Sequence, residues 1–195
     1  MALTWTDVAN LALSRLGSDL ISSLEDGTQA AKYCSLHVDR VYKALLSSGD
    51  WAFARARATL ARADSAPLFG FVFAYALPDD FIALSSLLDD NGNATEGVDA
   101  DDQAWRLEGL SILTDATQVS ICYIRTPDNP RMFPEWFTRA MVALLASELA
   151  VALARSESLR SILYQEGQIL LRDALAKNAD LGPAYPPSPL YEAAR

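Results

Sequence analysis

The sequence has few of the residues on which most metal and catalytic sites depend. His37 is its only histidine, and Cys34 and Cys122 are its only cysteines. A single histidine excludes a histidine-based metal cluster, and the two distant cysteines lack metal-ligand spacing. A serine hydrolase would need that histidine beside a serine, and no glycine-rich phosphate loop appears. The sequence therefore predicts no metal, no cofactor and no catalytic residue, and both cysteines are expected to be small core residues.

Positive charge is also scarce. The chain has 16 lysines and arginines against 25 aspartates and glutamates, a formal net charge of −9. A surface of this sign repels nucleic acid rather than collecting it. The first residues lack the basic start and apolar run of a signal peptide. The most apolar stretch, residues 140–154, contains Glu148 and is shorter than the roughly 20 residues that span a bilayer. We therefore expect a protein that stays in the cytoplasm or in a particle assembled there.

Helical periodicity marks both ends of the 195-residue chain. Thr4 and Asp7 form a capping box before a helix over residues 5–16, which Gly17 ends. A second helix is predicted over residues 28–48, followed by Trp51 and Phe53 as apolar anchors. Two more helices are predicted over residues 134–154 and 157–177, the second capped by Ser156. The third helix is apolar nearly all round, which predicts that it is the central one.

The middle of the chain has the composition and alternation of strands. Strands are predicted over residues 55–62, 71–77, 82–88, 104–107, 111–114 and 119–124, the last three as an antiparallel meander. The predicted fold is α+β, mainly α. A four-helix bundle core, residues 1–53 and 133–180, contains a β-rich insertion, residues 54–132, between helices two and three. The proline-rich residues 181–195 are predicted to form an extended C-terminal arm.

Two acidic features invite a catalytic interpretation. Asp79 and Asp80 are neighbours, and a glycosidase-like pair needs two carboxyls that face one substrate, roughly 5–10 Å apart. Neighbouring residues rarely supply that geometry, so a solvated turn at a strand end is the prediction. Glu148 lies in an apolar helix, where a buried carboxylate is costly unless it is paired. We predict a partnered, structural buried acid there; a subunit contact and a catalytic acid are the alternatives.

Seven segments along the chain form an ordered set of motifs. They are Ala12–Gly17, Ala30–Cys34, Leu45–Leu46 with Trp51–Ala54, Tyr75–Phe81, Leu107–Asp115, Tyr123–Ile124 and Phe133–Ala152. On this ordered set the chain resembles the tail tubular protein A family of short-tailed bacteriophages, adaptors that join the portal to the tail. Asp50, before Trp51, departs from the expected pattern, where a less charged residue such as proline would stand.

The resemblance implies a structural virion protein with no defined catalytic residues. It implies a homo-oligomeric ring, typically a dodecamer, that binds the portal above and a tail tube or nozzle protein below. DNA would pass through the ring without specific binding, and no membrane is involved. Within that picture the arm is predicted to contact a neighbouring subunit or the portal. The suspected interface residues are Leu181, Tyr185, Leu190 and Tyr191.

Two other functions remain open from the residues alone. One is a virion-associated peptidoglycan hydrolase, whose acids would be Asp79, Asp80, Glu108 or Glu148. The other is a cytoplasmic helical binding module unrelated to phages. Three arginines near a predicted strand edge, Arg55, Arg57 and Arg62, either face DNA or protect that edge from stray pairing; the second is the favoured interpretation.

Overall fold

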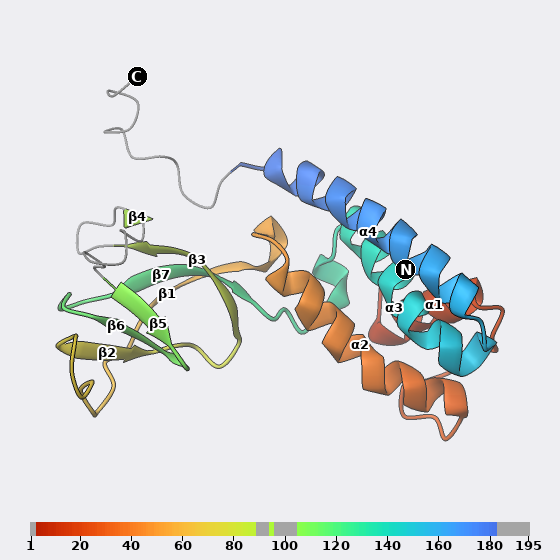
Figure 1. Cartoon of the computed structure of the whole chain (residues 1–195), viewed down its shortest axis with the longest axis horizontal. Coiled ribbons are helices and arrows are strands. Elements are labelled where there is room, and N and C mark those ends of the chain that lie inside the picture. Colours follow the sequence, from red (N-terminus) through yellow and green to blue (C-terminus); the bar gives the residue numbers. More distant parts are fainter. Residues whose placement is uncertain (1–2, 89–93, 96–104, 183–195) are drawn as a thin grey trace. The chain divides into compact units, whose positions relative to one another are not determined.

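A computed structural model describes residues 3–88, 94–95 and 105–182 (Figure 1). The described residues divide into two compact units. The helical unit combines residues 3–53 with residues 127–182, and the sheet unit contains the described part of residues 54–126.

The helical unit contains four α-helices. They are α1 (Trp5–Arg15), α2 (Gln29–Ser47), α3 (Glu135–Ala154) and α4 (Glu157–Ala179). The capping box of α1 is present, and the side chains of Thr28 and Ser156 accept hydrogen bonds at the starts of α2 and α4. Gly17 follows α1 with φ +66°, a conformation that favours glycine. The four helices and their caps therefore agree with the sequence predictions to within two residues.

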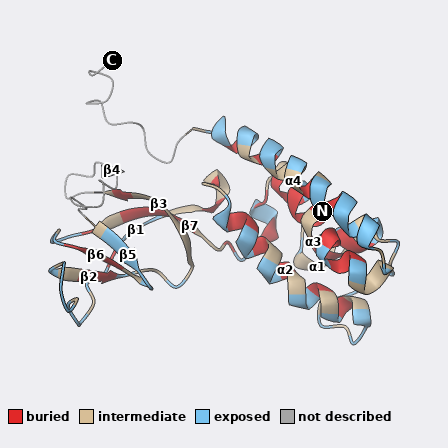
Figure 2. Cartoon of the chain, viewed as in Figure 1, coloured by how far each residue is buried: buried red, intermediate tan, exposed pale blue. Residues whose placement is uncertain are grey.

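Helix α3 lies at the centre of this unit, as predicted. Its buried residues surround the whole helix, and it packs against α1, α2 and α4 (Figure 2). The predicted four-helix bundle is nevertheless wrong, although the α+β class is confirmed. In a bundle, four helices surround a shared core. Here small apolar side chains on α3 let α1, α2 and α4 pack against this one central helix. An open groove remains between α2 and α4.

Helix α3 is also long and apolar enough, by length and composition alone, to cross a membrane. However, 61% of its most apolar window is buried inside the protein. A core helix that is covered on most sides has this composition for the same reason as a membrane span, because it faces apolar surroundings.

Side-chain hydrogen bonds join the end of α4 to the segment after α2. Asn178, 5% exposed, donates a hydrogen bond to the Asp50 carbonyl at 2.7 Å and accepts one from the Ala52 amide at 2.9 Å. Trp51 is fully buried, and its ring centroid lies 5.2 Å from that of Phe137. The predicted anchoring role of Trp51 is confirmed, whereas the contribution of Asn178 was not predicted.

The sheet unit contains two antiparallel sheets. Its strands are β1 (Arg55–Thr59), β2 (Phe73–Ala76), β3 (Phe81–Leu88), β4 (Ala94–Thr95), β5 (Trp105–Glu108), β6 (Ser111–Thr114) and β7 (Ser120–Arg125). One sheet has the order β1-β7-β3-β4 and the other the order β2-β6-β5. A core cluster lies within this unit, formed by Leu60, Tyr75, Leu87, Ile112, Val119, Ile121 and Tyr123.

The predicted meander of the last three strands is wrong in its final step. Strands β5 and β6 form a hairpin, but β7 leaves that sheet and pairs with β1 and β3. Residues 121–124 are buried in succession, a pattern that requires cover on both faces. Strands β1 and β3 pair with the two edges of β7, so β7 is an inner strand of its sheet with four successive buried residues, although chain order alone would place it beside β6.

Candidate functional site

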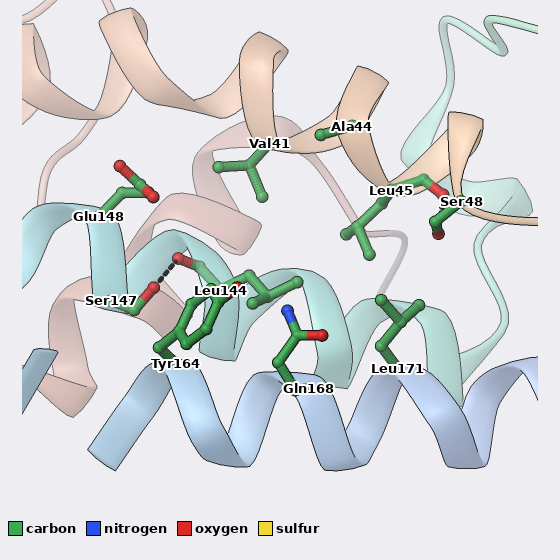
Figure 3. Close-up of a pocket in the computed structure, with 10 residues that line it drawn as sticks. All are labelled: Val41, Ala44, Leu45, Ser48, Leu144, Ser147, Glu148, Tyr164, Gln168 and Leu171. Carbon is green, nitrogen blue, oxygen red and sulfur yellow. Dashed lines mark hydrogen bonds between the residues drawn. The ribbon is translucent and has the colours of Figure 1, made fainter. Parts of the chain in front are cut away.

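An apolar groove of about 310 Å³ lies between α2 and α4, with α3 as its floor (Figure 3). We call it the helical groove. Its lining residues are Val41, Ala44, Leu45, Ser48, Leu144, Ser147, Glu148, Tyr164, Gln168 and Leu171.

Two glycines explain why α4 lies close to its neighbours while the groove stays open. A Cβ on Gly167 would come 2.6 Å from Leu144 Cδ2, so α4 approaches α3 closely at this point. A Cβ on Gly49 would come 2.3 Å from Leu175 Cδ2, so α4 also meets the end of α2. Away from that meeting point, the short side chains of Ala44 and Ser48 leave the space between the two helices unfilled.

The lining of the helical groove is mainly apolar, with polar groups near its margins. The Ser147 hydroxyl donates to the Leu144 carbonyl at 2.7 Å, so its donor is already used (Figure 3). The side chains of Val41, Leu45 and Leu171 project into the space (Figure 3). A surface of this kind suits an apolar side chain or a helix face better than a charged substrate.

Glu148 lies at the margin of the groove and is exposed, with 47% of its side chain accessible. The prediction of a structural buried acid is therefore wrong. Its carboxylate lies 3.9 Å from Nδ1 of His37, whose side chain is 19% accessible. Because the groove between α2 and α4 lies open above α3, this polar position faces the groove instead of the core. His37 is half-buried and precedes the buried Val38 on α2.

The sheet unit presents an apolar surface of a different shape. Leu68 is 97% exposed and Phe69 is 86% exposed, in the loop that leads into β2. We call these two residues the apolar tip. The base of the loop is fixed, since the Ala63 amide donates to the Ala74 carbonyl and the Val72 amide donates to Asp115 Oδ1, both at 2.8 Å.

The side chains of the apolar tip stay exposed although the loop that carries them lies beside its own sheet. Gly70 has φ +89°, a turn conformation that side chains rarely adopt. A concave space of about 450 Å³ is lined by residues 65–71 on one side and by residues of the β2-β6-β5 sheet, among them Ala74, Arg106 and Leu113, on the other. Two large apolar side chains are thus held in solvent by a loop whose two ends are hydrogen-bonded.

The four candidate acids are divided between the two units. Asp79, Asp80 and Glu108 belong to the sheet unit, whereas Glu148 belongs to the helical unit. Asp79 is exposed, and Asp80 Oδ1 accepts a hydrogen bond from the Tyr123 hydroxyl at 2.9 Å. Glu108 is exposed and lies 3.5 Å from Arg106. Within the described residues no group of three or more histidines, cysteines, aspartates or glutamates could hold a metal.

The corner at Asp80 has a structural role. The Phe81 amide donates to the Pro78 carbonyl at 3.1 Å, which closes a turn, and the Thr126 amide donates to the Asp80 carbonyl at 2.9 Å. Burial raises the pKa of the Tyr123 hydroxyl, and the hydrogen bond to Asp80 raises it further. The predicted turn at the strand end is confirmed, and its carboxylate joins β3 to β7.

Both cysteines are free and buried, as predicted. Burial raises the pKa of the Cys34 thiol to about 11, so the thiol stays protonated and weakly reactive at neutral pH.

The remaining predicted residues are the suspected interface residues and the three arginines. Leu181 is 64% exposed, and Tyr185, Leu190 and Tyr191 lie outside the described residues. Arg55 and Arg57 lie on β1, an edge strand of its sheet, and Arg62 lies beyond it with Cζ 3.3 Å from the centre of the Phe73 ring.

No protein-family model matches the chain, and a comparison with curated proteins finds no match. The resemblance to the tail tubular protein A family therefore remains a prediction that rests on the ordered segments of the sequence. Sequence reasoning missed both the helical groove and the apolar tip. The available signals were a glycine within a helical pattern at Gly167 and the exposed pair Leu68-Phe69 between Pro67 and Gly70.

Proposed function

We propose that the protein is a structural virion protein, a subunit of the adaptor ring that joins the portal of a bacteriophage to its tail. In this role it forms a homo-oligomeric ring, typically of twelve subunits, binds the portal on one side and a tail tube or nozzle protein on the other, and lines the channel through which DNA leaves. The protein then performs no chemical turnover and needs no cofactor.

The observation that carries this proposal is the kind of surface that the described residues leave uncovered. The helical groove and the apolar tip are both apolar, and they lie on different units of one acidic chain. Exposed apolar surface of this kind marks sites of protein association. An assembly subunit has a use for such surfaces, because its neighbours cover them in the particle.

An enzymatic role has less support from the same residues. The acids proposed for a peptidoglycan hydrolase are divided between the two units, and Asp80 already accepts a hydrogen bond from Tyr123. Alanine variants of Asp79, Asp80, Glu108 and Glu148 test that alternative directly. Lysis of purified cell wall that is lost in one of these variants would support the hydrolase over the adaptor.

Electron microscopy of the protein mixed with the portal protein encoded in the same genome tests the adaptor proposal. We expect a second ring stacked on the portal ring. The matched control is the protein without portal, which we expect to be mainly monomeric at micromolar concentration, because subunits of net charge −9 repel one another. Portal rings that remain bare at saturating protein would contradict the proposal, and a stable dodecamer formed without portal would contradict the expectation that the free protein is monomeric.

DNA should pass through such a ring without being held. Each lysine or arginine contact with a phosphate would add salt-sensitive retention. Arg62 also lies over the Phe73 ring, so one of the three candidate arginines already has an aromatic partner. Gel shifts with duplex DNA at physiological salt should show no tight complex, and a submicromolar complex would contradict this part of the proposal.

A further inference from the structure

We propose that the apolar tip of one subunit inserts into the helical groove of the next copy of the same chain. The inference rests on the ring assembly proposed above and names the residues that would form its repeating contact. It also accounts for two surfaces that have no function within a single chain.

The size of the groove suits the tip. A cavity of about 150 Å³ lined by apolar side chains holds a benzene molecule. The helical groove, at about 310 Å³, therefore has room for the Phe69 ring together with the Leu68 side chain. The ring face of Tyr164 and the side chains of Val41, Leu45 and Leu171 offer apolar contacts for both (Figure 3).

The chemistry of the groove disfavours a charged occupant and favours an apolar one. The only charged side chain that lines the groove is Glu148, at its margin, so a strongly charged peptide would gain few ion pairs there. Copies of one acidic chain also repel one another, and a contact between them has to rely on apolar burial. Leu68 and Phe69 are the two most exposed large apolar side chains among the described residues.

The contact joins two different surfaces of the same chain. Such a head-to-tail contact generates a ring when the rotation between subunits closes, and an open filament when it does not. A symmetric dimer, by contrast, would need one self-complementary surface. The tip and the groove therefore suit a ring better than a dimer.

The contact is small, which fits a protein that assembles only on a template. A buried aromatic side chain covers about 150–250 Å², whereas stable interfaces bury roughly 1,200–2,000 Å² in total. The tip alone should therefore hold two free subunits together only weakly. Subunits held side by side on a portal ring reach an effective concentration in the millimolar range, at which a weak contact becomes populated.

Disulfide cross-linking between two separate variants tests the contact. Phe69→Cys in one tagged chain is mixed at millimolar concentration with Gln168→Cys in an untagged chain, and both are oxidised. The native cysteines are buried and do not interfere. We expect a covalent dimer of the 21.2 kDa chain whose linked peptides contain positions 69 and 168.

The matched control replaces the groove position by Asp173→Cys. Asp173 is exposed and lies nine residues after Tyr164, which places it on the opposite side of α4. The 69–168 link should form at least tenfold faster than the 69–173 link. Equal rates would overturn the inference, because they would show that Phe69 meets the surface of α4 at random.

A second measurement uses assembly on the portal ring. Leu68→Ser and Phe69→Ser remove the tip, and Ala44→Phe fills the groove from an exposed position. Each should lower the affinity for assembly at least tenfold while the circular dichroism spectrum and Tm stay unchanged. Leu110→Ser is the control, since Leu110 is 81% exposed in the same unit but lies outside the tip.

The two measurements separate failure of this inference from failure of the proposed function. Tip variants that assemble normally on the portal, without a selective 69–168 link, would overturn the inference and leave the adaptor role intact. A selective link in a protein that never binds the portal would support the self-contact and contradict the adaptor role.

Discussion

Gly167 of α4 lies directly against Leu144 of α3, so closely that a Cβ on Gly167 would come 2.6 Å from Leu144 Cδ2 and 3.3 Å from the Leu144 amide nitrogen. Glycine inside a helix normally lowers stability by about 1 kcal/mol relative to alanine. Here its missing side chain permits the close approach of α4 to α3, which places Tyr164 and Gln168 along the helical groove.

Gly167→Ala should therefore destabilise the helical unit, although alanine is the better helix former. Overpacking costs about 1–3 kcal/mol, which exceeds the helix-propensity gain of about 1 kcal/mol. We expect a net loss of about 1 kcal/mol, measured by urea unfolding with circular dichroism at 222 nm. Leu144→Ala removes the clashing atoms, so in that background the same substitution should be neutral or stabilising. A purely stabilising effect in the wild-type background would contradict the close contact.

Asn178→Ala should destabilise the helical unit by about 2–3 kcal/mol. The substitution removes both hydrogen bonds that join α4 to the segment after α2, and it leaves the Asp50 carbonyl and the Ala52 amide without this partner. Urea unfolding measures the loss. Lys177→Ala, at the exposed neighbouring position, is the control and should change stability by less than about 0.5 kcal/mol. Similar losses in both variants would show that the hydrogen bonds of Asn178 contribute little.

Tyr123→Phe should weaken the pairing of β7 with β3 by about 1 kcal/mol at neutral pH, because Asp80 loses a hydrogen-bond donor. Hydrogen exchange of β7 amides measures this effect, and Tyr164→Phe, at a half-exposed position in the helical unit, is the control.

The pH dependence of Tyr123 has a defined sign. Burial and the Asp80 hydrogen bond raise the pKa of Tyr123 in the folded protein above the ordinary tyrosine value of about 10. The protonated hydroxyl therefore contributes stability that is complete below about pH 10 and is lost as pH rises through the raised folded pKa. Absorbance titration at 295 nm should show a late tyrosine ionisation, and its amplitude should be smaller in Tyr123→Phe.

Deletion of residues 181–195 should leave the helical unit almost unchanged, because α4 ends at Ala179 and the deletion removes none of its buried residues. We expect Tm to move by less than about 2–4 °C, the shift that corresponds to roughly 1 kcal/mol in a chain of this size. Assembly on the portal should weaken at least tenfold, about 1.4 kcal/mol, if the arm contacts a neighbour. An arm of equal length made of glycine and serine is the control. Normal assembly of the truncated chain would contradict an intersubunit role.

Local signals in the sequence determined the helices and most of the strands. The Thr4–Asp7 capping box, the Ser156 cap and the strand-end turn at Asp80 depend on residues within a few positions of one another. Interactions of that kind are encoded by spacing, so periodicity and capping rules locate them. The central place of α3 also followed from its composition, because a helix that is apolar all round has to be covered on most sides.

Only the tertiary structure decided how these elements pair and which surfaces remain open. The place of β7 between β1 and β3, the hydrogen bonds of Asn178 and the exposure of Glu148 each depend on residues far apart in the chain. At Gly167 the missing side chain lets α4 approach α3 closely, whereas the short side chains of Ala44 and Ser48 leave the space beside α2 unfilled. The helical groove results from these two features. A helical period specifies which face of a helix is apolar, but it does not specify how many helices cover that face. The number of covering helices depends on how closely separate elements pack. For this reason the structure has one central helix with an open groove and not the predicted bundle.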